Sequence, residues 1–238
     1  MIKRAALAVF AVSLSFFAIG GCSGGGGGNG GACPETNMGI EVCDPDAGPF
    51  SLVIDNAFFP VLVGSETVLE GTDDEGVFVR VETTVPGDTE MVAGVNTRVL
   101  VETEFGDGVL TEISRNFYAQ AADGTVCYFG EDVDIYEDGE IVAHDGAWRA
   151  GEDGNLPGIQ MPGDPEPGMI FQQEFAPGIA EDQSEILALG EEIDVPAGMF
   201  SDTLTAEDCN ALDGSTDIKV YVNGIGTAID EFAELISF

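Results

Sequence analysis

The feature that most constrains this chain is a regular alternation of apolar and polar residues that recurs between short turn signals. Residues 77–82 alternate valine with Phe, Arg and Glu, and residues 95–104 alternate in the same way over a longer run. Because successive side chains of a β-strand point to opposite faces, this period of two predicts strands with one face in the core and one in water.

Turn signals separate these segments and set the expected topology. They include Pro86-Gly87-Asp88, Asp123-Gly124 and Asp138-Gly139, whose composition favours tight reversals. Further strands are predicted at 109–118, 126–129, 135–143, 169–175, 184–195, 200–204, 218–222 and 226–238. Residues 181–190 and 228–236 alone also suit a short helix. We therefore expect a mostly β protein: a single antiparallel domain with a strongly curved sheet or incomplete barrel and few short helices.

The N-terminus predicts export. Residues 1–21 combine Lys3 and Arg4, an apolar run and small residues before Cys22, which is the pattern of a lipoprotein signal peptide. Cys22 is the predicted lipidation site and mature N-terminus, and the glycine-rich residues 22–32 predict a flexible tether. The acidic β domain is expected over residues 33–238. A transmembrane anchor at residues 5–21 is the alternative, at the short limit for crossing hydrocarbon.

The predicted location follows from these signals. Lipid on Cys22 would hold the protein to the cell envelope without a helix crossing the bilayer. Ser23, and not Asp, follows the cysteine. In a Gram-negative cell this residue favours sorting to the outer membrane.

Charge excludes one class of partner. The chain carries 44 acidic and 7 basic residues, a formal net charge of −37, and only five of the basic residues follow Cys22. Nucleic acid is excluded as a partner, because duplex phosphates are bound through clustered Lys and Arg. The acidity has two interpretations that can hold together: a surface adapted to salt, or binding of divalent cations such as Ca²⁺.

Acidic pairs in loops are the candidate calcium ligands, since Ca²⁺ takes carboxylate and carbonyl oxygens. No EF-hand loop is present, because Asp132-x-Asp134 lacks the Gly and Glu that such a loop requires. The candidates are Glu131, Asp132, Glu152, Asp153, Glu181 and Asp182.

A segment rich in glycine and proline interrupts the alternation at residues 144–168. It contains His144 and Trp148, the only His and the only Trp of the chain. Long loops in compact domains are often functional, so Trp148 and the nearby Glu174 are candidate ligand-binding residues. The alternative is that Trp148 fills one end of the sheet while the prolines stiffen a connection.

The cysteines predict disulfides, because export permits them. With Cys22 lipidated, Cys33, Cys43, Cys127 and Cys209 form an even set with three possible pairings. Proximity in sequence favours Cys33 with Cys43 and Cys127 with Cys209. A metal cluster is disfavoured, because no CxxC pair is present.

Catalytic motifs do not single out a reaction. A nucleophile elbow, a phosphate loop and a zinc signature are all missing from the sequence, and a Ser-His-Asp triad would have to use His144. A carboxylate-based hydrolase of surface carbohydrate needs only two acids. The candidates are Glu131, Asp132, Glu174, Glu181 and Asp182, and this hypothesis predicts one carboxyl group desolvated enough to stay protonated.

Several motifs together resemble a widespread family of uncharacterised bacterial exported proteins. They are Asp-Asn-Ala-Phe-Phe-Pro at 55–60, Asn-Phe-Tyr-Ala-Gln at 116–120, Tyr-Phe-Gly-Glu-Asp at 128–132, Gly-Glu-Asp-Gly at 151–154, Pro-Gly-Ile-Gln-Met-Pro at 157–162 and Gln-Glu-Phe at 173–175. The resemblance covers about residues 54–232. Family members often carry His where this chain has Ile179. The resemblance implies one exported domain and no particular chemistry.

Three functions are therefore compatible with the sequence. The first is a lipid-anchored envelope protein without enzymatic activity that binds a small-molecule, glycan or protein ligand, or Ca²⁺. The second is the carboxylate hydrolase, and the third is a purely structural component of the cell surface. The first predicts carboxylates and carbonyl oxygens that converge on one cation, and the third predicts no deep pocket.

Overall fold

The computed structural model describes residues 33–238. The predicted signal peptide (1–21), the predicted lipidation site Cys22 and the predicted tether (22–32) lie outside these residues. Two short 3-10 helices, η1 (Ile40–Cys43) and η2 (Pro45–Ala47), open the described part of the chain. No helix of residues 33–238 is long and apolar enough to cross a membrane.

All other regular elements of the described residues are strands. They are β1 (Glu66–Thr72), β2 (Phe78–Thr84), β3 (Thr89–Val92), β4 (Val95–Gly106), β5 (Val109–Gln120), β6 (Val126–Glu137), β7 (Glu140–Ala143), β8 (Trp148–Arg149), β9 (Gly158–Met161), β10 (Ile170–Gln172), β11 (Asp182–Leu189), β12 (Ile193–Val195), β13 (Gly198–Phe200), β14 (Thr203–Asn210), β15 (Thr216–Val222), β16 (Gly226–Asp230) and β17 (Ala233–Ser237).

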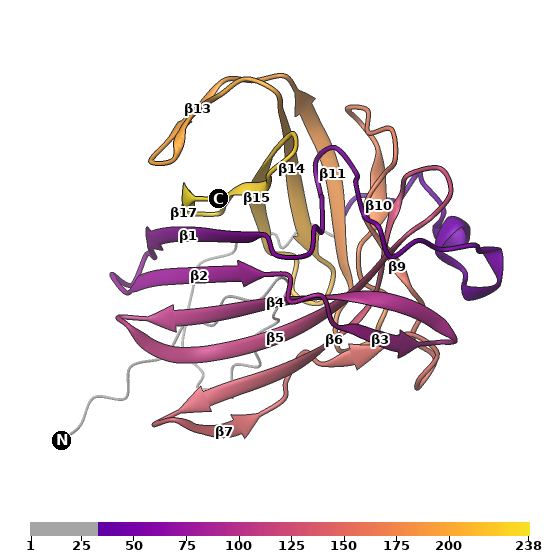
Figure 1. The fold of residues 1–238 in the computed structure, drawn as a ribbon, viewed down its shortest axis with the longest axis horizontal. Helices are drawn as coiled ribbons and strands as arrows, with labels where there is room; N and C mark the ends of the chain where they lie inside the picture. Colours follow the sequence, from indigo (N-terminus) through magenta and orange to yellow (C-terminus); the bar gives the residue numbers. More distant parts are fainter. Residues whose placement is uncertain (1–32) are drawn as a thin grey trace, which may run out of the picture.

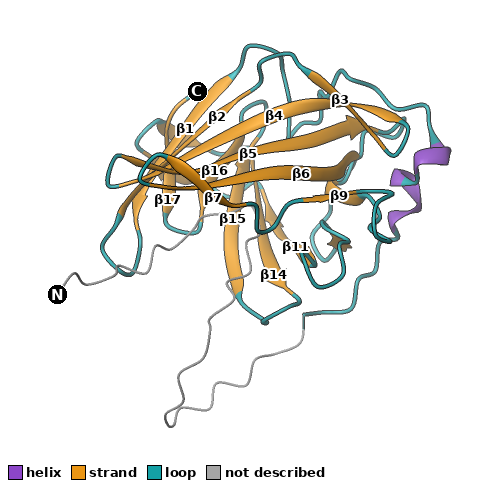
Figure 2. Ribbon diagram, turned by 90° about the horizontal axis from the view of Figure 1, so that it is seen from below, coloured by secondary structure: helices purple, strands orange, loops and turns teal. Residues whose placement is uncertain are grey.

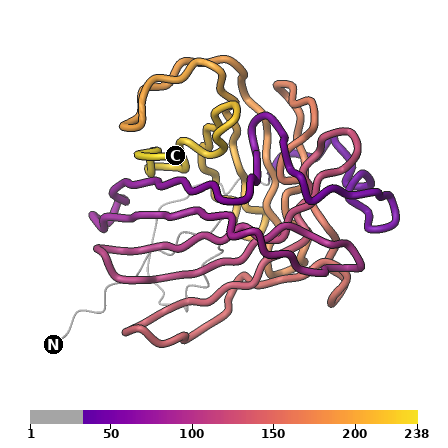
Figure 3. The backbone as a smooth tube through the Cα atoms, viewed as in Figure 1, coloured from indigo at the N-terminus to yellow at the C-terminus, as the bar shows by residue number. Residues whose placement is uncertain are grey.

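One antiparallel sheet of 15 strands forms the body, in the order β10-β11-β14-β15-β16-β17-β1-β2-β4-β5-β6-β7. β3 pairs with β4, β8 and β9 pair with β6, and β12 and β13 form a separate hairpin. Figure 1 shows β1, β2, β4 and β5 side by side, with β11, β14 and β15 crossing behind them at a steep angle. Figure 2 shows the sheet curving around an interior, and the chain path in Figure 3 shows the β12–β13 hairpin projecting from it.

The two ends of this sheet approach each other without forming a ladder. The Leu156 amide donates to the Phe175 carbonyl at 2.9 Å in an isolated bridge. Gly158 of β9 lies so close to the segment after β10 that an added Cβ would meet the Gln173 carbonyl oxygen at 1.9 Å. The sheet is not closed, so the predicted mostly β, antiparallel fold with a strongly curved sheet or incomplete barrel is confirmed.

Local sequence explains the turns that follow β4 and β6. Asp107 and Asp138 have φ near +50°, and each is followed by a glycine of positive φ. These are the tight hairpin turns that an Asp-Gly pair favours. The helical alternative was wrong at both positions: residues 181–190 contain β11 (Asp182–Leu189), and residues 228–236 form the end of β16, a turn and most of β17. Pairing with neighbouring strands outweighs the helix-favouring composition there.

The hydrophobic core centres on aromatic side chains between the two halves of the sheet. Tyr118 of β5 stacks on Tyr128 of β6 with ring centroids 4.7 Å apart, and Phe59 meets Tyr118 edge to face at 5.1 Å. Tyr221 of β15 reaches the same group from the opposite half, 6.5 Å from Phe59. These rings hold the crossing halves together and form one end of the interior.

The cysteine pairing differs from the predicted one. The structure joins Cys33 to Cys209 and Cys43 to Cys127, with Cα atoms 5.7 and 5.5 Å apart. The N-terminal arm between Cys33 and Cys43 runs past β10, where the amides of Asn37 and Met38 donate to the Ile170 carbonyl. The arm thus separates the two cysteines that are close in sequence, and each meets a distant strand.

Candidate functional site

The inner face of β4, β5 and β6 carries an unexpected row of polar side chains. Glu102 lies opposite Ser114, and Glu104 lies opposite Glu112. Asn116 lies opposite Glu131 of β6. Directly opposed residues of antiparallel strands share a face, and so do residues two apart. Register therefore directs these carboxylates into the barrel.

A bulge at Gly130 places two key side chains on the same face. Tyr128 and Glu131 are three residues apart, a spacing that points side chains to opposite faces of a regular strand. The β5–β6 register slips here, so that Tyr118 pairs with Tyr128 while Asn116 pairs with Glu131. Gly130 has φ +127°, and a Cβ on it would lie 2.3 Å from the Trp148 carbonyl oxygen. Only glycine fits this position.

Trp148 closes the site from the side of β8. It pairs with Glu131 in the β6–β8 register, is 3% exposed, and meets the Tyr128 ring at 5.3 Å. The segment expected to be irregular, residues 144–168, contains β8 and β9, both bound to β6. Trp148 therefore fills the sheet interior beside a carboxylate, as the structural alternative for this residue predicted.

Glu174 and Asp182 approach the same place from the β10–β11 turn. The amides of Gln173 and Glu174 both donate to the Asp182 carbonyl, at 2.8 and 3.2 Å. Glu174 is 1% exposed and Asp182 is 4% exposed. Together with Glu131, Tyr128 and Trp148 these residues form what we call the carboxylate cluster.

Several oxygens of this cluster have no hydrogen-bond partner. They are both carboxylate oxygens of Glu174, Oε1 of Glu131 and Oδ1 of Asp182. Burial, together with Glu112, raises the pKa of Glu131 well above its usual range. Burial and Asp182 do the same to the pKa of Glu174. Burial and Asp208 raise the pKa of Asp182 to about 8. Asp182 therefore retains its proton at neutral pH.

A lysine lies at the centre of the opposite half. Lys219 of β15 is 5% exposed, and its Nζ lies 3.1 Å from Asp208 Oδ2 and 3.7 Å from Asp230 Oδ1. Burial alone lowers the pKa of Lys219, but Asp230 and Asp208 outweigh it and hold the pKa well above its usual value. Lys219 is therefore charged, and it is the only buried basic side chain of the described residues.

Acids outnumber this lysine inside the barrel. Seven acidic residues of the described chain are buried, six of them on or beside the sheet and Asp73 in a turn. Burial raises the pKa of Glu112 to about 9, and burial with Asp230 raises the pKa of Glu102 to about 7. Glu102 is partly accessible because it lines an interior cavity. The interior is a polar environment short of positive charge.

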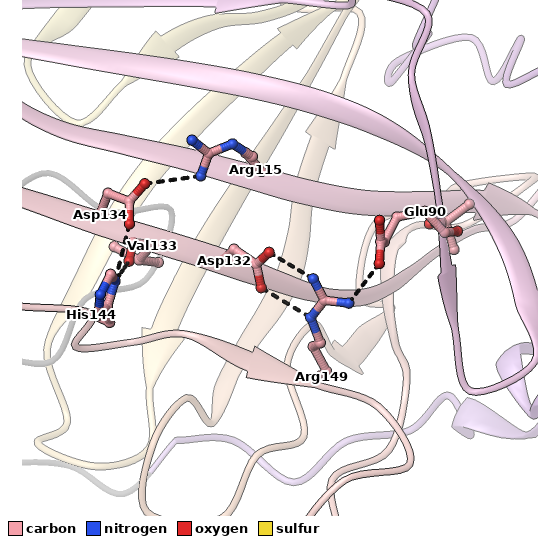
Figure 4. Close-up of polar contacts among 8 residues, drawn as sticks. Glu90, Arg115, Asp132, Val133, Asp134, His144 and Arg149 are labelled. Carbon is pink, nitrogen blue, oxygen red and sulfur yellow. Dashed lines mark hydrogen bonds and ion pairs between the residues drawn. The ribbon is translucent and has the colours of Figure 1, made fainter.

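The outer face of the same strands is arranged differently (Figure 4). Arg149 donates to both oxygens of Asp132 and to Glu90, and its guanidinium lies 4.7 Å from the centre of the Phe117 ring. Asp134 Oδ2 accepts a hydrogen bond from the Arg115 guanidinium at 3.0 Å, and Asp134 Oδ1 lies 3.1 Å from His144 Nδ1. Each of these acids has a basic partner.

The eight predicted metal and ligand residues therefore divide into two groups. The structure brings Glu131, Glu174, Asp182 and Trp148 together in the interior. Asp132 points outward to Arg149, Glu152 and Asp153 lie in an exposed turn before β9, and Glu181 accepts a hydrogen bond from the Gly178 amide at 3.0 Å. Residues 33–238 contain no group of three His, Cys, Asp or Glu side chains that could hold a metal ion.

Sequence reasoning missed the residues of the opposite half and Glu102. Lys219 is the only lysine after residue 3, but in the run 217–222 it shares one side with Asp217 and Tyr221, whereas Ile218, Val220 and Val222 lie on the other side. The alternation therefore did not indicate that Lys219 is buried. It also did not distinguish the inward acids from the many other carboxylates.

Comparison of the chain with protein-family models, with curated proteins and with solved structures finds no match in any of the three. The arrangement of the site is thus the basis for a functional proposal.

Proposed function

We propose that this protein is a lipid-anchored envelope protein that binds a positively charged ligand inside its open barrel. One observation carries the proposal: the described residues bury six acids on or beside the sheet against one lysine. The resemblance to exported bacterial proteins and the predicted lipid on Cys22 support the location.

Charge balance gives the physical reason. A carboxylate taken out of water is stable only when it is paired, protonated or bound to a cation. On the outer face arginines provide the pairing, whereas Glu131 and Glu174 have no arginine within reach in any described contact. A cationic ligand would supply both the missing charge and donors for the unpartnered oxygens.

Calorimetric titration tests this proposal. The full-length protein in detergent, at about 0.15 M salt to suppress weak surface binding, is titrated at pH 7.5 with Ca²⁺ and separately with small organic amines. We expect saturable binding of one of these cations, with release of protons that is seen as a dependence of the heat on the buffer. Proton release is expected because a cation favours the ionised form of acids whose pKa is raised.

A matched pair of variants locates the binding. Glu174→Gln removes one inward carboxylate, and Glu152→Gln removes one exposed carboxylate. Only the first is expected to weaken binding, by at least tenfold. If no cation binds saturably, or if both variants bind equally, the proposal is wrong.

A second candidate function, a carboxylate hydrolase of surface carbohydrate, is favoured by one observation. The pKa of Glu131 and that of Glu174 are both raised, as a general acid requires. Release of a chromogenic phenol from aryl glycosides, lost in both Glu131→Gln and Glu174→Gln, would support this function in place of simple binding.

A further inference from the structure

The two ends of the strand order differ in how their outer edges are covered. At one end the N-terminal arm lies against β10, where the Asn37 amide donates to the Ile170 carbonyl and the Asn37 side chain accepts from the Ile170 amide, both at 2.9 Å. At the other end β7 pairs with β6 alone, and Figure 1 shows it at the outer margin of the molecule. Among the described residues, the outer edge of β7 therefore has no strand partner.

The side chains of β7 are also unusual for an exposed strand. Ile141, Val142 and Ala143 form an apolar run without a polar residue, and the first two are 49% and 52% exposed. A strand with one wet face alternates apolar and polar residues, whereas a continuous apolar run is typical of a strand with neighbours on both faces. The opposed residue on β6, Tyr136, adds half-buried apolar surface beside Ile141. β7 thus has the composition of a covered strand in an uncovered position.

The free edge of β7 is short and interrupted. β7 has four residues, and Val142 has no partner in its register with β6. Val142 is therefore the extra residue of a bulge, which stays outside the ladder. Short strands and bulges protect an edge against indiscriminate pairing. A segment that pairs with β7 is accordingly about as short as β7 itself, and its flanking side chains contribute to the choice of partner.

Charge decides between two kinds of occupant. Glu140 precedes the apolar run, Asp138 lies in the turn before it and Asp145 follows it, and all three are exposed. If a second copy of the chain paired with β7 in antiparallel register about residues 141 and 142, Asp138 of each copy would lie opposite Asp145 of the other. Like charges directly opposite each other on paired strands are destabilising, whereas lysine or arginine at these positions is attracted. The edge therefore favours a basic segment over a second copy.

We propose that β7 is a docking strand for a partner protein, which adds an extended segment with an apolar, β-branched centre and a basic residue at each end. Main-chain hydrogen bonds to the free edge provide affinity, and the apolar side chains of the segment contact Ile141 and Val142. The basic residues lie near Asp138 and Asp145 and determine the selectivity. The site contains no residue of the carboxylate cluster, so this inference goes beyond the proposed function and is independent of it.

Synthetic peptides test the docking site. The probe is Lys-Thr-Val-Ile-Val-Thr-Lys with blocked ends and a neutral fluorophore, and its fluorescence anisotropy is followed as full-length protein in detergent is added at pH 7.5 and about 0.1 M salt. We expect saturable binding, and at least tenfold weaker binding of two controls. One has Glu in place of both Lys, and the other has Pro in place of the central Ile, which removes an amide donor. No binding of the probe, or equal binding of the acidic control, overturns the proposal.

A matched pair of variants locates the docking site. Val142→Lys places a lysine on the edge of β7, and Val109→Lys makes the same change on β5, where Val109 is 59% exposed. Because the new lysine repels the basic probe and removes an apolar contact, only Val142→Lys is expected to weaken binding, by at least tenfold. The melting temperatures of both variants should stay within a few degrees of that of the unchanged protein. Equal binding by both folded variants would place the probe elsewhere and overturn the proposal.

Two further measurements decide the matter even if one variant fails to fold. Should Val142→Lys be unfolded, Asp145→Asn is compared with Asp164→Asn, a change of an exposed aspartate in the loop before β10. Only Asp145→Asn is expected to weaken probe binding, by at least threefold, and an equal effect of the two changes overturns the proposal. Analytical ultracentrifugation without peptide tests the other occupant, and we expect no dimer that depends on this edge. A dimer that Val142→Lys dissociates would assign the edge to a second copy and overturn the proposal.

Discussion

The two faces of β4, β5 and β6 treat the same kind of side chain in opposite ways. Glu131 and Asp132 are adjacent in sequence, yet Asp132 lies outside in a bidentate pair with Arg149 and Glu131 lies inside with Oε1 unpartnered. The register decides which of the two faces each acid points to. Four of the five basic residues after Cys22 are arginines, and the arginines that form ion pairs lie on the outer face. Figure 4 shows two of them, Arg115 and Arg149. Outward acids are paired with arginine, whereas inside the sheet Lys219 pairs with Asp208 and Asp230, and Glu131 and Glu174 have no ion pair among the described residues.

Removing the basic partner of an inward acid should lower the unfolding free energy much more than removing that of an outward acid. This is the largest of the expected effects. Lys219→Met leaves Asp208 and Asp230 buried without their cation, which costs about 3–5 kcal/mol of unfolding free energy. Arg115→Met breaks an exposed pair with Asp134 and costs less than about 1 kcal/mol. Urea unfolding at pH 7 measures both. Equal losses would show that the inner pair is no more important than the outer one.

The inward acids should also invert the usual dependence of stability on pH. The folded pKa is about 6 for Asp217, about 7 for Glu102, about 8 for Asp182 and about 9 for Glu112, each above its ordinary value of 3.8 or 4.5. Between the ordinary and the folded pKa the folded protein binds more protons than the unfolded chain, so its stability falls as pH rises.

The expected size is at least about 3 kcal/mol between pH 5 and pH 9, since a tenfold change in the proton affinity of one group corresponds to about 1.4 kcal/mol. Urea unfolding at constant ionic strength measures it. A stability that is flat or rises toward pH 9 would mean that the inward acids are ionised and compensated in the fold.

The bulge at Gly130 turns Glu131 to the inner face, and a substitution at Gly130 tests its role directly. Gly130→Ala places a Cβ against the Trp148 carbonyl at φ +127°, and we expect a loss of about 2–3 kcal/mol. Gly139→Ala, at φ +80° in an open turn after the same strand, should cost only about 1 kcal/mol. Trp148 is the only Trp, so its emission should shift in the first variant alone. An unchanged spectrum in a folded Gly130→Ala protein would contradict the assigned geometry.

The smallest expected effect gives the clearest test, because the change in unfolding free energy should have opposite signs for the adjacent residues Glu131 and Asp132. At pH 8, Glu131→Gln replaces a buried acid by a neutral isostere and should stabilise the fold by about 1–2 kcal/mol. Asp132→Asn weakens the pair with Arg149 and should destabilise it by about 1 kcal/mol. Thermal and urea unfolding of both variants give the signs, and two losses of similar size would sink the distinction between the faces.

The sequence predicted the strands better than it predicted the interior. Alternation located β2, β4, β5 and β15, because burial on one face imposes a period of two on the residues. It could not locate the Gly130 bulge, and one bulge decides which face Tyr128 and Glu131 share. The cysteine pairing failed for a related reason: sequence proximity says nothing of an arm that runs along β10 to reach two separate strands.

The sequence predicted only part of the candidate site, because it does not show which acids point inward. Half of the predicted site residues lie together in the interior, namely Glu131, Glu174, Asp182 and Trp148. The other half, Asp132, Glu152, Asp153 and Glu181, do not. Glu102, Asp208 and Asp230 were not chosen, because an inward and an outward acid look alike in a chain with 44 acidic residues.

The bond between Cys33 and Cys209 also has a mechanical consequence. Cys33 is the first described residue, and Cys209 belongs to β14, which has β11 on one side and β15 on the other. A pull on the chain from the direction of the predicted lipid anchor passes through sulfur into a strand held by neighbours on both sides. The arm from Cys33 to Cys43 is thereby relieved of that load, and the described part of the chain resists being unravelled from its N-terminal end.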